Sequence, residues 1–116
     1  MSAARTLRAA AAGVLLAAGA GTASAHQLNV FASTDCEVVQ IEAKFSSGRA
    51  PVGGEVRILD GRNTLLATLA LTSEGTLSVP LAGLDTSSGL LIEVDTGDHE
   101  DYWIVTPQDI ARACPS

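Results

Sequence analysis

Apolar and polar residues alternate in short runs along most of the chain after residue 26, and small or polar residues separate the runs. The run at residues 37–45 is the clearest, because from residue 39 onward every second side chain is apolar and the others are polar or charged. Its apolar face consists of Val39, Ile41, Ala43 and Phe45. A period of two residues is typical of a strand with one buried face, so this run predicts a half-buried β-strand.

Seven such runs predict seven short strands. They are residues 27–32, 37–45, 55–59, 64–71, 76–81, 90–94 and 102–105. Residues 60–63, Asp-Gly-Arg-Asn, are typical of a hairpin turn. Residues 107–112 predict one or two helical turns, with Thr106 as the N-cap and Pro107 at the first helical position. Many short strands and little helix predict an all-β fold, a small seven-stranded sandwich of the immunoglobulin or prealbumin type.

The start of the chain has the three parts of a cleavable secretory signal. Arg5 and Arg8 give it positive charge, residues 9–20 form an uncharged apolar stretch, and Ala23-Ser24-Ala25 is the small-x-small pattern that signal peptidase accepts. The apolar stretch has about a dozen residues, whereas a membrane-spanning helix needs roughly 20. We therefore expect residues 1–25 to be a signal peptide that is removed, and we expect no stable membrane anchor.

The mature chain is then a single β-sandwich domain at residues 26–116, located in the periplasm or secreted. Removal of the signal changes the formal charge from −6 to −8, because five Lys and Arg remain against thirteen Asp and Glu. A surface of this charge repels nucleic acid and anionic lipid headgroups. It attracts cations, basic partners and metal ions, so these are the expected classes of partner.

The mature chain contains two cysteines, Cys36 and Cys114. In a small exported domain such a pair is typical of a disulfide, which here would join the first turn to the tail. Closure of so long a loop contributes roughly 4 kcal/mol in the chain-entropy model. A metal bound by the two thiolates is the alternative, but their spacing matches no zinc motif.

The sequence predicts no enzyme. It has no Gly-x-Ser-x-Gly nucleophile elbow, no phosphate-binding Gly-rich loop, and only two histidines to serve a Ser or Cys nucleophile. Its four aromatic residues are too few for the sugar-binding cleft of a glycosidase. Tyr102 and Trp103, in the last predicted strand, are interpreted as core and sheet-face residues and not as a binding platform.

The two histidines, His26 and His99, are the candidates for a metal site. If the signal is cut after Ala25, the α-amino group and Nδ1 of His26 can chelate one metal ion. The reference pKa values of such groups, roughly 8 and 6.5, make both nitrogens accessible near neutral pH. His99 would add a third nitrogen. A neighbouring carboxylate, from Asp95, Asp98, Glu100 or Asp101, would add an oxygen ligand or orient an imidazole, with Asp98 and Glu100 as the favoured pair. This donor set suits Ni(II) or Cu(II) and also Co(II), while an ordinary solvated loop around His99 is the alternative.

The opening of the mature chain, His26-Gln27-Leu28-Asn29-Val30-Phe31-Ala32, also carries a family resemblance. It resembles the His-x-Leu-x-Val-Phe-Ala start of exported accessory proteins of nickel and cobalt ECF-type uptake systems, the NikL/CbiL-like group. The likeness continues through residues 39–48, 55–61 and 72–75. It ends at residues 95–99, Asp-Thr-Gly-Asp-His, which are similar to the family's Asp-x-Gly-x-x-His segment but one residue shorter.

The resemblance implies a periplasmic or cell-surface protein that binds Ni(II) or Co(II), or presents it to a membrane metal transporter. His26 and His99 match the family's terminal and late histidines. We therefore expect an exported metal-binding accessory protein without catalytic activity. A metal-independent β-sandwich interaction module at the cell surface is the main alternative. Copper redox chemistry of the histidine-brace type is a third, for which the chain offers no extended aromatic substrate face.

Overall fold

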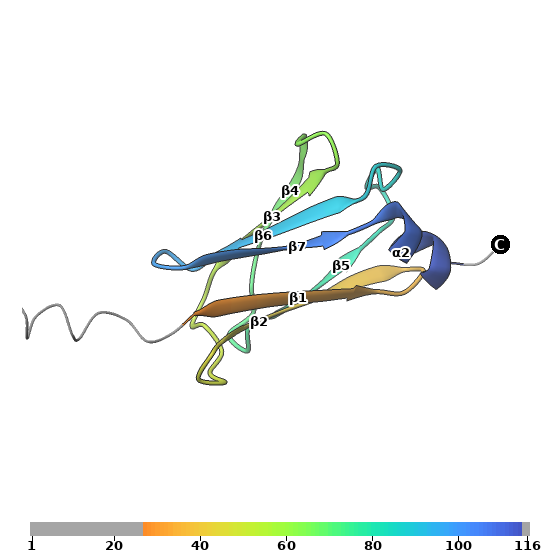
Figure 1. The fold of residues 1–116 in the computed structure, drawn as a ribbon. Helices are drawn as coiled ribbons and strands as arrows, with labels where there is room; N and C mark the ends of the chain where they lie inside the picture. Colours follow the sequence, from red (N-terminus) through yellow and green to blue (C-terminus); the bar gives the residue numbers. More distant parts are fainter. Residues whose placement is uncertain (1–26, 115–116) are drawn as a thin grey trace, which may run out of the picture.

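Seven β-strands and one short helix succeed each other along residues 27–114, the part of the chain that the computed structural model describes (Figure 1). The elements are β1 (Leu28–Thr34), β2 (Val38–Phe45), β3 (Glu55–Asp60), β4 (Leu65–Ala70), β5 (Thr76–Pro80), β6 (Leu90–Asp95), β7 (Glu100–Val105) and α2 (Pro107–Ala113). All seven predicted strands are therefore confirmed. The expected signal peptide at residues 1–25 and His26 lie outside the described residues.

Four strands extend beyond their predicted ends, β3 and β6 by one residue each and β1 and β7 by two. β1 continues to Thr34, which pairs with Val39, because the turn begins at Asp35, two residues later than predicted. The Asp35 carboxylate accepts hydrogen bonds from the N–H groups of Glu37 and Val38, at 2.7 and 2.8 Å, and so closes that turn. At the other end of the chain, β7 begins at Glu100, which pairs with Asp95 across the β6–β7 hairpin.

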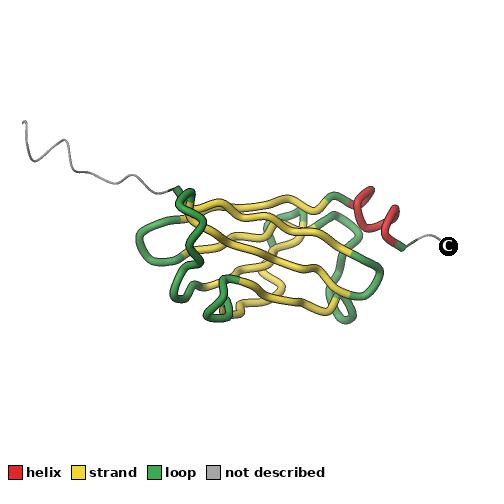
Figure 2. Tube along the Cα trace, turned by 90° about the horizontal axis from the view of Figure 1, so that it is seen from below, coloured by secondary structure: helices red, strands yellow, loops and turns green. Residues whose placement is uncertain are grey.

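The strands form two antiparallel sheets, of order β1-β2-β5 and β4-β3-β6-β7. The all-β sandwich is thus confirmed. It differs from a constant-type immunoglobulin domain in the fourth strand, which pairs with the third strand and not with the fifth. Figure 2 shows α2 at one end of the sandwich, opposite the end where β1 begins.

The core lies between the two sheets and is made of every second residue of the strands, as the alternating pattern predicts. The most deeply buried side chains are Val39, Ile41, Val56, Ile58, Leu90, Ile92 and Val94. All are aliphatic, and β-branched residues dominate, which suits packing on a pleated surface. The predicted apolar face of β2 is buried except at Phe45, which is half-buried at the end of the strand.

The turn predicted at residues 60–63 is also present. Asn63 adopts a left-handed backbone conformation with φ 66°, which Asn tolerates better than most residues. The Asp60 side chain is 6 % exposed, and its carboxylate accepts hydrogen bonds from the N–H groups of Arg62 and Thr64. This buried charge is therefore matched by two backbone donors, as a buried polar group must be.

The helix α2 begins as predicted, with Thr106 as N-cap and Pro107 at its first position. Thr106 and Asp109 form a reciprocal capping box, in which each side chain accepts a hydrogen bond from the other residue's N–H. No residue of α2 is fully buried, although Ile110 packs against the core. The helix is therefore held by its first turn, by Ile110 and by the covalent link at its end.

That link is the disulfide between Cys36 and Cys114. The two residues are 78 positions apart in sequence, and their Cα atoms lie 4.5 Å apart. It joins the end of α2 to the β1–β2 turn, as predicted. A disulfide indicates an oxidising, extracytoplasmic compartment. In the described part of the chain, no helix has the length and apolar character that crossing a membrane requires.

We expect loss of the disulfide to lower the free energy of unfolding by up to about 4 kcal/mol, because its loop is long and opening it releases chain entropy in the unfolded state. Urea denaturation of the mature domain, compared with Cys36→Ser/Cys114→Ser, measures this difference. Reductant should destabilise the parent chain and leave the double variant unchanged. Equal destabilisation of both by reductant would contradict the assignment.

Stability should also depend on acid pH through two capping carboxylates. The N–H groups of Val38 and Glu37 lower the pKa of Asp35 below its ordinary value of 3.8. Hydrogen bonds from the Thr106 N–H and hydroxyl lower the pKa of Asp109 in the same way. The unfolded chain therefore takes up these protons at higher pH than the folded one. The stabilisation is fully present above pH 3.8 and is lost as the pH falls through the lowered values.

Urea titrations at pH values between about 5 and 2 test this, with Asp35→Asn/Asp109→Asn as the variant. The double variant should show a flatter loss of stability with acid than the parent chain. Glu74→Gln, which removes one charge from the exposed β4–β5 turn, is the control for charge alone. An unchanged slope in the double variant would refute the role of these caps.

Candidate functional site

The first and last strands of the sandwich, β1 and β7, run side by side in the same direction along one edge of the molecule (Figure 1). They belong to different sheets. The Val30 N–H donates a hydrogen bond to Asp101 Oδ2, at 2.7 Å. Since the two strands run in parallel, Leu28 and His99, each two residues before this bonded pair, lie at the same level along the edge.

His99 is positioned by the tight hairpin between β6 and β7. Its carbonyl oxygen accepts a hydrogen bond from the Thr96 N–H at 2.9 Å, and the Asp95 carboxylate accepts one from the Gly97 N–H at 2.7 Å. Gly97 has φ 98°, a conformation that favours glycine and reverses the chain. The hairpin thus holds the backbone of His99 firmly just ahead of β7.

The ring of His99 lies edge-on to the ring of Phe45, with centroids 5.3 Å apart and planes at 72°. Phe45 is the register partner of Leu28 at the start of β1. His99 therefore lies against the strand pair where β1 begins. It is partly exposed and lines an open hollow of about 350 Å³. Its neighbours in this hollow are Phe45, Ser47, Arg49, Ala50 and Val52.

Gln27, the first described residue, is fixed beside the end of β2. Its carbonyl accepts a hydrogen bond from the Ser46 N–H at 2.8 Å, and its own N–H donates to Ser46 Oγ at 3.2 Å. His26, the other predicted metal ligand, precedes Gln27 in sequence and lies outside the described residues. The attachment point of His26 is thus at the same end of the sandwich as His99.

The two carboxylates predicted near His99 differ in their positions. Asp98 is exposed in the hairpin turn. Glu100 begins β7, where successive side chains point to opposite faces, and it lines a hollow on the outer face of its sheet together with Tyr102. Asp101 instead points inward, to β1. The structure therefore separates Glu100 from the ring of His99.

Within residues 27–114, no three His, Cys, Asp or Glu side chains lie close enough together to hold a metal ion. His99 is the only histidine in this range. His26, the other histidine of the chain, lies outside this range.

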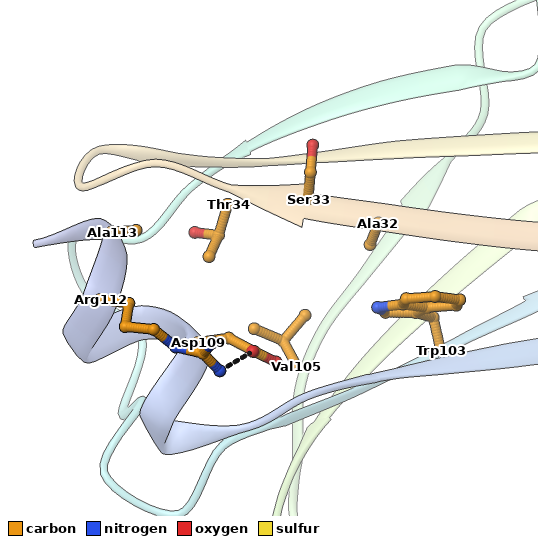
Figure 3. A pocket seen from close by; sticks show the side chains of 8 residues that line it. All are labelled: Ala32, Ser33, Thr34, Trp103, Val105, Asp109, Arg112 and Ala113. Atoms are coloured by element: carbon orange, nitrogen blue, oxygen red, sulfur yellow. Dashed lines mark hydrogen bonds and ion pairs between the residues drawn. The ribbon is translucent and has the colours of Figure 1, made fainter.

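A second hollow, of about 420 Å³, lies between β1, β7 and α2 (Figure 3). Trp103 forms its end nearest the middle of the strands, and the ion pair between Arg112 and Asp109, at 3.1 Å, forms the end at the helix. The remaining lining residues are Ala32, Ser33, Thr34, Val105 and Ala113. This hollow is the space left where β1 and β7 separate beyond their hydrogen bond.

Tyr102 is a sheet-face residue, as predicted, because it lies on the outer face of its sheet and is 60 % exposed. The structure corrects the expectation that Trp103 belongs to the core, since its side chain is 37 % exposed, and Ile104 beside it is 56 % exposed. The physical reason for the exposure of Trp103 is that β7 is an end strand, so its inward side chains have neighbours on one side only. The sequence did contain a signal for exposed apolar side chains in this strand. Residues 102–104 are three consecutive large apolar residues, and a strand cannot direct all three to one buried face.

No protein-family model and no curated protein matches this sequence. The resemblance to the nickel and cobalt accessory proteins therefore stays a prediction, carried by the residues of this chain alone.

We expect Asp101→Ala to loosen the start of β1, because the Val30 N–H loses its charged acceptor. The free energy of unfolding should fall by about 1 to 2 kcal/mol, and exchange of the Val30 amide hydrogen should speed up. Asp101→Asn keeps an acceptor oxygen and should recover most of the protection. Unchanged exchange at Val30 in Asp101→Ala would show that this hydrogen bond does not hold the edge.

Proposed function

We propose that this chain is an exported metal-binding accessory protein that holds Ni(II) or Co(II) through His26 and His99 and assists a membrane uptake system. One observation carries the proposal: the hydrogen bond between Val30 and Asp101 aligns β1 with β7, so that the start of β1 and His99 lie at the same end of the sandwich. The sequence alone left open whether the two segments meet.

Covalent reach supports this pairing. Leu28 lies level with His99, and two residues of extended chain span at most about 7 Å. A mature chain that begins at His26 thus has its α-amino group and its imidazole within that reach of Leu28. Because the chelate needs a free amino group, the precursor with its signal attached lacks this donor set.

The chemistry of the donors favours late first-row metals. Two imidazoles and an amine are nitrogen ligands of the kind that Ni(II), Co(II) and Cu(II) prefer to carboxylates and water. Asp98, in the same exposed turn as His99, is the carboxylate that can complete the site. Glu100, on the other face of the sheet, contributes only long-range negative charge. Retention of a metal by this donor set requires the nitrogens to be unprotonated.

The setting of the site fits delivery of a metal ion outside the cytoplasm. The disulfide indicates an oxidising compartment, and the acidic surface attracts divalent cations. The location that we propose is the periplasm or the extracellular medium, and the receiver of the metal is a membrane transporter. The resemblance of the opening heptad to nickel and cobalt accessory proteins supports this assignment.

Isothermal titration of the mature protein with Ni(II), Co(II) and Cu(II) tests the proposal. Binding of one ion should weaken by at least about 100-fold in His26→Ala and in His99→Ala, since each removes a direct ligand. A chain with one glycine added before His26 should show a similar loss, because its amino group is displaced. Affinity should also fall with increasing acidity, because protons compete with the metal ion for the nitrogen ligands.

Glu100→Gln is the matched control, because it removes a neighbouring charge on the opposite face and should change the affinity little. Circular dichroism of each variant checks that the sandwich is intact. Equal affinity of the parent, His26→Ala and the glycine-extended chain would overturn the proposed site. It would leave the metal-independent interaction module as the better hypothesis, which the exposed aromatic residues on β7 favour.

A further inference from the structure

The aromatic residues of this protein are distributed unusually. The chain has only four, and three of them lie exposed along the edge formed by β1 and β7 instead of in the core. Phe31 is 52 % exposed, and its ring meets that of Trp103 edge-on at 5.1 Å. We call Phe31, Tyr102, Trp103 and Ile104 the edge patch. Tyr102 and Ile104 lie on the outer face of β7, and Trp103, in contact with Phe31, lies on its other face. Exposed aromatic and aliphatic side chains that line one edge in this way are typical of an interaction surface.

The edge patch flanks the edge of β7 that faces away from β6, and no backbone ladder occupies this edge in the described residues. Among the described residues, β7 pairs with β6 alone, and its contact with β1 includes the Asp101 side chain but no backbone ladder. In an antiparallel ladder, residue pairs that exchange hydrogen bonds alternate with pairs that do not. Thr96 and His99 are a hydrogen-bonded pair, so the next residue of β7, Glu100, belongs to a pair that is not. The backbone groups of Glu100, Tyr102 and Ile104 therefore point away from β6, as unpaired donors and acceptors.

The charge next to the patch indicates the kind of partner. Tyr102 lines an open hollow of about 340 Å³ on the outer face of its sheet, where the side chains of four acidic residues and one arginine also lie. These are Glu55, Glu93, Asp95, Glu100 and Arg57. Arg57 lies 3.5 Å from Glu93 and balances that carboxylate, which leaves an excess of negative charge beside the ring of Tyr102. A lysine or arginine in the hollow would meet both the carboxylates and the aromatic face.

We propose that the edge patch docks an extended segment of a partner protein, in which apolar side chains alternate with Lys or Arg, and that this segment adds a strand to β7. The backbone of β7 supplies the pairing, Tyr102 and Ile104 contact the apolar side chains, and the acidic hollow receives a basic one. A second copy fits less well, because it would bring two chains of charge −8 and their carboxylates together. The docking requires no metal ion and is independent of the site at His99.

The probe is an acetylated and amidated peptide of about seven residues, the length of a typical strand, in which lysine alternates with valine. It is titrated into mature protein kept free of metal by a chelator. Fluorescence of Trp103, the single tryptophan, and backbone amide shifts report binding. We expect saturation at concentrations below about 1 mM, with increased exchange protection at the amides of Glu100, Tyr102 and Ile104.

Matched variants on the two ends of the same sheet identify the site. Tyr102→Ser/Ile104→Ser should weaken binding by at least about fivefold. Leu65→Ser/Leu69→Ser, which removes two exposed apolar residues from the opposite end strand β4, should leave it unchanged. Replacing lysine by glutamate, or valine by serine, in the peptide should abolish saturation. Thermal unfolding confirms that each variant is folded.

Several outcomes would overturn the docking proposal. They are the absence of saturation up to about 5 mM peptide, equal binding of the glutamate peptide, and amide shifts confined to β4 or β5. Sedimentation of the protein alone is the remaining measurement. A dimer that dissociates in Tyr102→Ser/Ile104→Ser would assign the edge patch to a second copy and would likewise overturn the proposed partner.

Discussion

The corner between β1 and β7 is the constraint on which the rest of this structure depends. The two strands belong to different sheets, so no ladder of backbone hydrogen bonds joins them, and the bond from the Val30 N–H to Asp101 connects them across the gap. At the far end the disulfide ties α2 back to the β1–β2 turn. Between these two ties the edges separate, which leaves the hollow beside Trp103 open and the outer edge of β7 unpaired.

Many of the aspartates in this domain bind backbone N–H groups, which the sequence alone does not suggest. Six aspartates accept hydrogen bonds from main-chain N–H groups at turns, at the helix cap and at the corner. They are Asp35, Asp60, Asp85, Asp95, Asp101 and Asp109. A charged acceptor strengthens such a bond, and it also occupies the carboxylate. Asp95 and Asp101, near His99, therefore stabilise the fold, whereas the exposed Asp98 accepts no such bond within the described part of the chain.

Most of the fold could be predicted from the sequence because the information is local. Alternation identifies each strand and its buried face, and Thr106 and Pro107 fix the start of α2. The predicted export signal favours a disulfide between the two cysteines. Local patterns contain much less about which strands become neighbours. The attachment of β4 to β3 and the parallel course of β1 beside β7 follow from packing of the whole domain.

The same limit explains which parts of the candidate site the sequence predicts. The candidate ligand residues can be identified from the sequence, since His26 and His99 are its only histidines. Whether the two residues can meet depends on the register between two strands, which no local pattern specifies. The exposure of Trp103 was missed for a related reason, because an inward-pointing residue is buried only if another strand flanks it, and β7 is the last of its sheet.

The two proposed sites share one strand, and this has a thermodynamic consequence. His99 immediately precedes β7, Tyr102 and Ile104 lie within it, and Asp101 between them holds β1 in register. A segment paired with β7 would restrict the motion of the strand that aligns His99 with the start of β1. Any effect of that pairing on metal affinity must be matched by an equal effect of the metal on pairing, because coupling between two binding sites is reciprocal. Such coupling would pass through Asp101. Among the described residues, its side chain makes the hydrogen bond that joins β7, the strand of the edge patch, to β1, the strand that follows the proposed ligand His26.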